Sequence, residues 1–170
     1  MSNFFKKNEK GVTLMELIVS LALFSIVIIV VLSLFSTGIT AQRKVLALQG
    51  VQENARFILE FMAKEIRMSI INSSTVSTLD ITRPGGERIG YAFVNGDIER
   101  RTIPGSQGGA INSEGIIVNG SFYTAGIGTT DNLEPKVTIV LGVRGSGTKI
   151  EEQARIDLQT TLSQRTLDIP

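Results

Sequence analysis

The sequence contains no cysteine and no histidine among its 170 residues. The absence of cysteine excludes disulfides and thiolate chemistry. The absence of histidine removes the commonest general base and metal ligand, which lowers the expectation of an enzyme. The 17 basic and 16 acidic side chains give a formal net charge of +1, so no strong overall field points to nucleic acid. We therefore expect no catalytic residue, no metal, no cofactor and no nucleic-acid partner.

One apolar run dominates the N-terminal part of the chain. No charged residue occurs from Leu17 to Phe35, and about nineteen residues are enough to cross a bilayer core as one helix. Basic residues beside such a span tend to stay in the cytoplasm, and Lys6, Lys7 and Lys10 precede this one. A cleaved signal peptide fits less well, because the stretch "STGITAQRK" after the run is a poor match to a small-residue cleavage site.

A single acid, Glu16, lies at the edge of this run. An acid at the bilayer centre costs roughly 2.5–3.5 kcal/mol, and less near the edge, so Glu16 calls for a partner. A cut after Gly11 would give Val12 a new amino group, charged at neutral pH. An amine and a carboxylate at about 4 Å attract by about 4 kcal/mol at an effective dielectric of 20, before desolvation is subtracted. The two groups could pair within one helix or between staggered helices, and an acid so placed indicates subunit assembly.

The stretch "KGVTLMELIVSLALFSIVII" resembles the N-terminal signature of type IV prepilins and pseudopilins, with a basic leader, a glycine, Thr, Glu and a long apolar helix. The resemblance implies that a membrane aspartic peptidase cuts the leader, residues 1–11, after Gly11 and methylates Val12. It also implies that Glu16 and Thr13 serve subunit assembly. The family often has phenylalanine where Val12 stands, a departure that bears on the efficiency of cleavage.

The same resemblance implies the partners and the location. The partners would be other pilins or pseudopilins in a filament or tip complex, the prepilin peptidase, an inner-membrane assembly platform and membrane lipid. The precursor would cross the bacterial cytoplasmic membrane once, with its C-terminal domain outside, before entering a pilus or a periplasmic pseudopilus. "VQENARFILEFMAKEIRMS" and "LQTTLSQR" resemble minor pilins and the J-type pseudopilins of type II secretion.

The sequence is compatible with several functions. A retractable pilus, a secretion pseudopilus and a DNA-uptake filament share all these features. A membrane-anchored binding or sensor module that does not polymerise is the alternative outside assembly, and it predicts an uncut leader.

The apolar helix is expected to continue as an amphipathic one. Residues 12–37 would form the membrane-spanning or filament-core part and residues 38–72 the amphipathic part, ending near Ile71 because no proline occurs before Pro84. Gly38 predicts a weak joint between them. Glu60 and Lys64 stand at a favourable four-residue spacing. Apolar residues recur on one face at three- and four-residue steps: Val51, Ala55, Ile58, Met62, Ile66 and Ile70.

The remainder, residues 73–170, has the alternating pattern of strands. Ile89, Tyr91 and Phe93 fall on one face before a turn at residues 95–96, and a second Asn-Gly turn is expected at residues 119–120. The expected fold is α+β, a long N-terminal helix packed on a small antiparallel sheet.

Other candidate sites in this part have ordinary explanations. Asp131, Asn132 and Glu134 could supply oxygens to calcium, but the EF-hand spacing is missing. The charge run at residues 99–101 is expected to be a solvated strand face. Two glycosylation patterns, at Asn72 and at residues 119–121, are of a kind that is common by chance.

Overall fold

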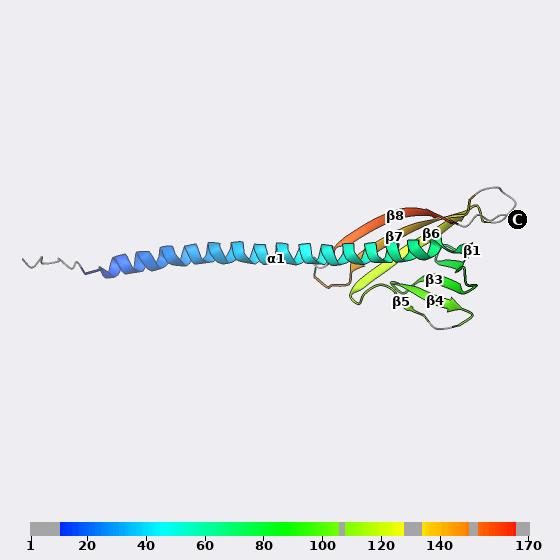
Figure 1. Cartoon of the computed structure of the whole chain (residues 1–170). Coiled ribbons are helices and arrows are strands. Elements are labelled where there is room, and N and C mark those ends of the chain that lie inside the picture. The colour runs from blue at the N-terminus through cyan, green and yellow to red at the C-terminus, as the bar shows by residue number, and fades with distance from the viewer. Residues whose placement is uncertain (1–10, 106–107, 128–133, 150–152, 166–170) are drawn as a thin grey trace, which may run out of the picture. The chain divides into compact units, whose positions relative to one another are not determined.

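A computed structural model describes residues 11–105, 108–127, 134–149 and 153–165. These residues divide into two compact units, with the boundary between Gln42 and Arg43. Within these described ranges, one long helix is followed by strands, as Figure 1 shows. In chain order the elements are α1 (Leu14–Arg67), β1 (Ile70–Ser74), β2 (Thr78–Thr82), β3 (Arg88–Val94), β4 (Asp97–Ile103), β5 (Gly108–Ala110), β6 (Ile116–Ala125), β7 (Lys136–Gly145) and β8 (Arg155–Ser163). The structure thus confirms the α+β class.

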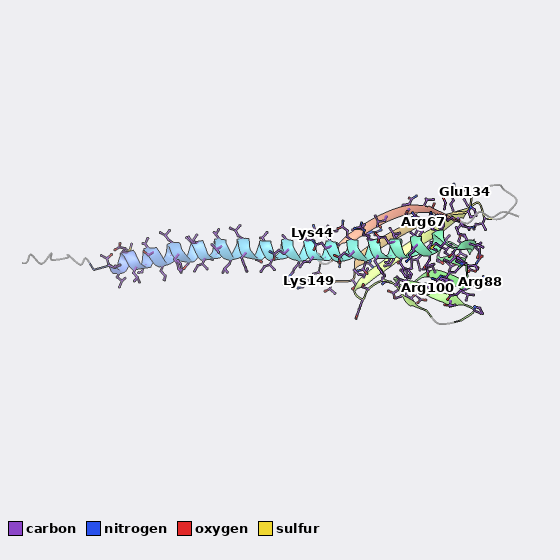
Figure 2. All side chains as sticks on the ribbon, in the orientation of Figure 1. Lys44, Arg67, Arg88, Arg100, Glu134 and Lys149 are labelled. Atoms are coloured by element: carbon purple, nitrogen blue, oxygen red, sulfur yellow. The ribbon has the colours of Figure 1, made fainter. Side chains whose placement is uncertain are left out.

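In the first unit, α1 exposes its apolar side chains all round. Every residue from 14 to 42 is exposed in this chain, and the side chains stand out from the helix in Figure 2. The hydroxyls of Ser25, Thr37 and Thr40 donate to the carbonyl four residues earlier, at 2.8, 3.0 and 3.1 Å. These hydroxyls are therefore satisfied without water. The helix is continuous through Gly38, and the weak joint expected there stays a prediction.

In the second unit, α1 buries one face. Five of the six residues predicted for this face are buried, namely Val51, Ala55, Ile58, Met62 and Ile66. They belong to a single apolar core that also holds residues of both sheets. In the view of Figure 1, β8 runs along one side of this part of α1 and β3–β5 lie on the other. The three- and four-residue spacing of the sequence therefore predicted the packing face correctly.

The helix ends earlier than the sequence predicts. It stops at Arg67, and Ile70, expected on the buried helix face, begins β1 with 43% of its surface exposed. Ile71 is buried in its place. Tertiary hydrogen bonds explain the difference: the Arg165 amide donates to the Arg67 carbonyl at 3.0 Å, and the Ile71 amide donates to the Gln164 side chain at 2.9 Å. The two residues that follow β8 thus bind the last turn of the helix and the start of β1.

The strands form two antiparallel sheets. One has the order β1-β2-β3-β4-β5 and the other the order β6-β7-β8. In β7 alternate residues are fully buried, namely Val137, Ile139, Leu141 and Val143. The period-two pattern of the sequence therefore predicted the inner face of this strand correctly.

The two Asn-Gly pairs have different structures. Asn95 and Gly96 join β3 to β4 as a two-residue turn, and both have positive φ, 54° and 88°. That geometry is the reason for the Asn-Gly preference in hairpins. The turn predicted at Asn119 and Gly120 is wrong, because both lie inside β6, paired with β7 at Gly142 and Leu141.

Gly120 is needed for close packing. A Cβ on Gly120 would lie 2.5 Å from the Phe93 ring and would overlap the carbonyl oxygen of Val140. Phe93 stacks on Phe122 with ring centroids 4.8 Å apart, so this contact joins β3 of one sheet to β6 of the other. The glycine therefore allows the two sheets to approach each other at this point.

Candidate assembly segment at the N-terminus

The residues predicted for processing and assembly lie at the start of the described chain. Gly11, Val12 and Thr13 precede α1, are not part of a helix or strand, and are exposed. The peptide bond between Gly11 and Val12 is therefore in extended or irregular backbone that another protein can reach. The leader lysines, Lys6, Lys7 and Lys10, lie outside the described residues.

Thr13 caps the helix. Its hydroxyl accepts a hydrogen bond from the Glu16 amide at 3.2 Å, and its carbonyl accepts one from the Leu17 amide at 3.1 Å. Thr13 is thus the N-cap residue and Glu16 is the third helical residue, which is the spacing of a capping box. This role was not predicted from the sequence, although Thr-x-x-Glu before an apolar run is its usual sequence pattern.

Glu16 has two physical roles available in this position. Its carboxylate lies in the first turn of α1, where the partial positive charge of the helix N-terminus favours an anion. The residue is exposed, and within the described part of the chain its side chain makes no ion pair. The carboxylate can therefore stabilise its own helix and also remain accessible to a cation from another molecule.

The helix that follows can contact lipid or other helices. Exposed apolar side chains continue from Leu14 to Phe35, the latter with 68% of its surface accessible. At 1.5 Å per residue this stretch is about 33 Å long, which matches a bilayer core of about 30 Å. Only α1 is long and apolar enough to cross a membrane among the helices of the described residues.

A second charged group lies in the other unit, around Glu65. Its carboxylate accepts two hydrogen bonds from Arg100, at 3.0 and 2.9 Å, and one from the Tyr91 hydroxyl. Arg83 lies 3.5 Å away. The prediction that residues 99–101 form a solvated strand face is therefore wrong for Arg100. Its side chain is three-quarters covered and turns toward α1.

The groups around Glu65 shift the pKa of its carboxyl group. Burial raises the pKa of Glu65, but hydrogen bonds from Arg100 and Tyr91 and the attraction of Arg100 and Arg83 outweigh burial, so its pKa lies below the ordinary value. Burial and the bond to Glu65 raise the pKa of Tyr91 well above its ordinary range. The phenol therefore stays protonated and donates. This group joins α1 to β3 and β4 and explains how the sheet is fixed to the helix.

The remaining candidates do not converge on a site. Asp131 and Asn132 lie outside the described residues, and Glu134 is exposed. No group of three metal-ligating side chains occurs in the part of the chain that the structure describes. The amide of Asn72 donates to Thr82 at 2.8 Å, which explains this asparagine without a glycan. The Glu60 carboxylate pairs with Arg56 at 2.9 Å, not with Lys64 as its spacing predicted.

Comparison with known proteins gives one match. The model of the prokaryotic N-terminal methylation motif matches residues 6–32, a range that holds the leader lysines, the Gly11–Val12 bond, the Thr13 cap and Glu16. No curated protein and no solved structure matches the chain. The motif implies processing by a prepilin peptidase and assembly into filaments in general, and its apolar helix fits membrane anchoring of a pilin. The methylation motif therefore indicates that this chain is a precursor of the type IV pilin-like family.

Proposed function

We propose that the chain is a structural subunit, a minor pilin or pseudopilin, of a type IV pilus or type II secretion filament. The observation that carries the proposal is the methylation motif at residues 6–32, which includes the capped start of α1, where every residue from 14 to 42 is exposed. This exposed stretch packs on nothing among the described residues, and packing of many copies in a filament would cover it. The role is structural and not catalytic, which the lack of histidine and cysteine supports.

Processing would begin at the Gly11–Val12 bond. Both residues are exposed and precede the helix, so a peptidase can bind this backbone without unwinding α1. Lys6, Lys7 and Lys10 would hold the leader at the cytoplasmic face, with the strand-rich unit outside. Cleavage removes these three cations and frees the amine of Val12, which is methylated in a separate transfer step and stays charged at neutral pH.

Assembly would use the attraction between this amine and Glu16. The carboxylate lies in the first turn of an exposed helix and has no ion-pair partner among the described residues. In lipid, an unpaired charge is costly, so a neighbouring subunit that brings its amine to Glu16 gains both attraction and relief of that cost. The same contact would set the axial register between helices.

Substitutions at Glu16 separate assembly from capping. Glutamine at this position keeps a side chain that could accept a capping bond from the Thr13 amide but carries no charge, whereas alanine removes both the acceptor and the charge. We expect Glu16→Gln and Glu16→Ala to insert into the membrane and be cleaved normally, and both to be strongly depleted from filaments. Glu53→Ala, an exposed acid on the same helix, is the matched control and should assemble normally.

The readout is the ratio of each variant in sheared filaments to that in the membrane fraction. Normal incorporation of Glu16→Gln with loss of Glu16→Ala would show that Glu16 acts only as a cap. An uncut leader together with indifference to both changes would favour the anchored sensor module.

A further inference from the structure

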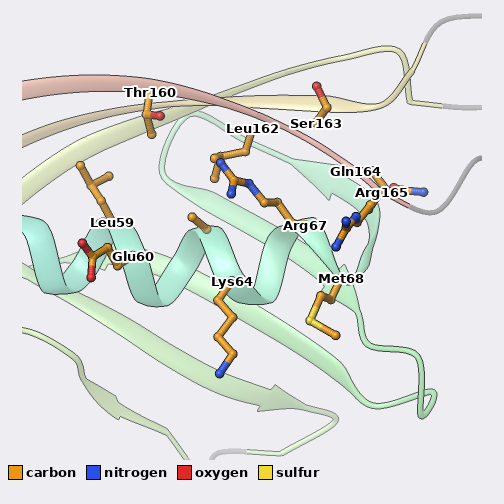
Figure 3. A pocket seen from close by; sticks show the side chains of 11 residues that line it. Leu59, Glu60, Lys64, Arg67, Met68, Thr160, Leu162, Ser163, Gln164 and Arg165 are labelled. Atoms are coloured by element: carbon orange, nitrogen blue, oxygen red, sulfur yellow. The ribbon is translucent and has the colours of Figure 1, made fainter.

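One edge of the three-stranded sheet is open. β8 is the last strand in the order β6-β7-β8, and it pairs only with β7 among the described strands. A groove runs between this edge and α1, as two adjoining pockets of about 820 and 710 Å³. Leu59 and Glu60 line both pockets, so the pockets lie next to each other along the helix. Figure 3 shows the first pocket, with α1 on one side and β8 on the other.

The floor of this groove is apolar and incompletely covered. Inward-facing residues of β8 alternate along the strand, and Ile156 and Leu158 are only partly buried. Leu59 of α1 lines both pockets, and Ala63 lines the first. A strand added beside β8 would extend the sheet at about 4.8 Å spacing and place alternate side chains on this floor.

The charges at one end of the groove are unbalanced. Lys64, Arg67 and Arg165 line the first pocket, and Figure 3 labels all three. None of them makes an ion pair within the described residues. The single acid in that pocket, Glu60, is held by Arg56 at 2.9 Å. Arg67 and Arg165 lie on the β8 side of α1 in Figure 3, whereas Lys64 extends away from β8, so this end offers two cations to a ligand next to an apolar floor.

We propose that this groove binds an extended segment of another protein, which adds to the edge of β8 as a fourth strand. The segment is apolar at alternate residues and carries acidic side chains at the end that reaches Arg67 and Arg165. The open edge supplies main-chain hydrogen bonds, the floor selects apolar side chains, and the cations set the direction of the segment. The proposal does not depend on whether the chain polymerises.

The test uses the full chain in detergent micelles and two capped peptides. One peptide is Thr-Val-Thr-Val-Thr-Val-Asp-Asp, and the other has two lysines in place of the aspartates. We expect saturable binding of the acidic peptide alone. The double variant Arg67→Glu, Arg165→Glu should bind it about tenfold more weakly and gain affinity for the lysine peptide, as expected for two charge pairs at a rim.

Arg144→Glu is the matched control, because Arg144 is an exposed cation on the outward side of neighbouring β7. Its affinity for the acidic peptide should equal that of the wild type. Amide exchange of the complex should show new protection in β8. Equal binding of both peptides, equal weakening by Arg144→Glu, or protection outside β8 would overturn the proposal. So would self-association through β8 without peptide, or protection of β8 by anionic-lipid vesicles but by neither peptide.

Discussion

Arg100 of β4 holds Glu65 of α1 with two hydrogen bonds, from Nε at 3.0 Å and from Nη2 at 2.9 Å. Only 11% of the Glu65 side chain and 25% of the Arg100 side chain is accessible. The two residues are 35 positions apart in the sequence, so this pair fixes the β1–β5 sheet to the helix. Breaking one side of such a pair leaves a half-buried charge without its partner.

Glu65→Gln should lower the free energy of unfolding by about 1–3 kcal/mol, because Arg100 and Tyr91 would lose their anionic acceptor. Urea unfolding of the full chain in detergent measures the loss. Glu60→Gln removes an exposed pair with Arg56 and should cost less than about 0.5 kcal/mol. Equal losses in the two variants would show that the Glu65 group does not stabilise the fold.

The stability of this unit should also depend on pH through Glu65. The folded-state pKa lies below the ordinary value of 4.5, so the stabilising contribution is fully present above that value. It is lost as the pH falls through the folded-state pKa. The difference in unfolding free energy between wild type and Glu65→Gln should therefore be constant from about pH 7 to pH 5 and shrink below about pH 4. A difference that grows on acidification would contradict this assignment.

Gly120→Ala should destabilise the second unit by about 1–3 kcal/mol, because the new methyl group would overlap Phe93 and the backbone of β7. Gly109→Ala is the control, since a Cβ there meets nothing within 4 Å. Thermal unfolding of both variants gives the comparison. A neutral Gly120→Ala would mean that the two sheets can separate at this point without cost.

Thr13→Ala should weaken the start of α1 by about 1 kcal/mol, because the Glu16 amide loses its acceptor. Amide exchange at Glu16 and Leu17 should become faster, while exchange in the middle of the helix stays the same. Thr13→Ser keeps the hydroxyl and should exchange as the wild type does. Unchanged exchange in Thr13→Ala would show that the cap is not formed in solution.

The parts of the fold that depend on local pattern were predictable, and those that depend on distant contacts were not. The spacing of Val51, Ile58 and Ile66 gave the buried helix face, and the alternation in β7 gave the inner face of its sheet. The end of α1 at Arg67 depends on Arg165, about a hundred residues later. No local pattern contains that information, and helix propensity alone predicts that the helix continues beyond Arg67.

The same distinction applies to single residues. An Asn-Gly pair predicts a turn wherever it occurs in a sequence. Gly120 nevertheless lies in the middle of a strand, where the Phe93 ring of the other sheet leaves no room for a Cβ. Nothing local in the sequence distinguishes Glu65 from the other acids of the helix, because its partner Arg100 is distant in sequence. The Thr13 cap, in contrast, is purely local and could have been predicted from Thr-x-x-Glu.

Mass spectrometry of the N-terminal peptide of the membrane-extracted or filament-bound chain tests the central claim most directly. The account predicts a chain that begins at Val12 and carries one added methyl group on its amine. A variant with Gly11 replaced by a bulkier residue, such as Gly11→Val, should keep the leader. An intact Met1 in the wild type, or a first residue beyond Phe35, would contradict the account.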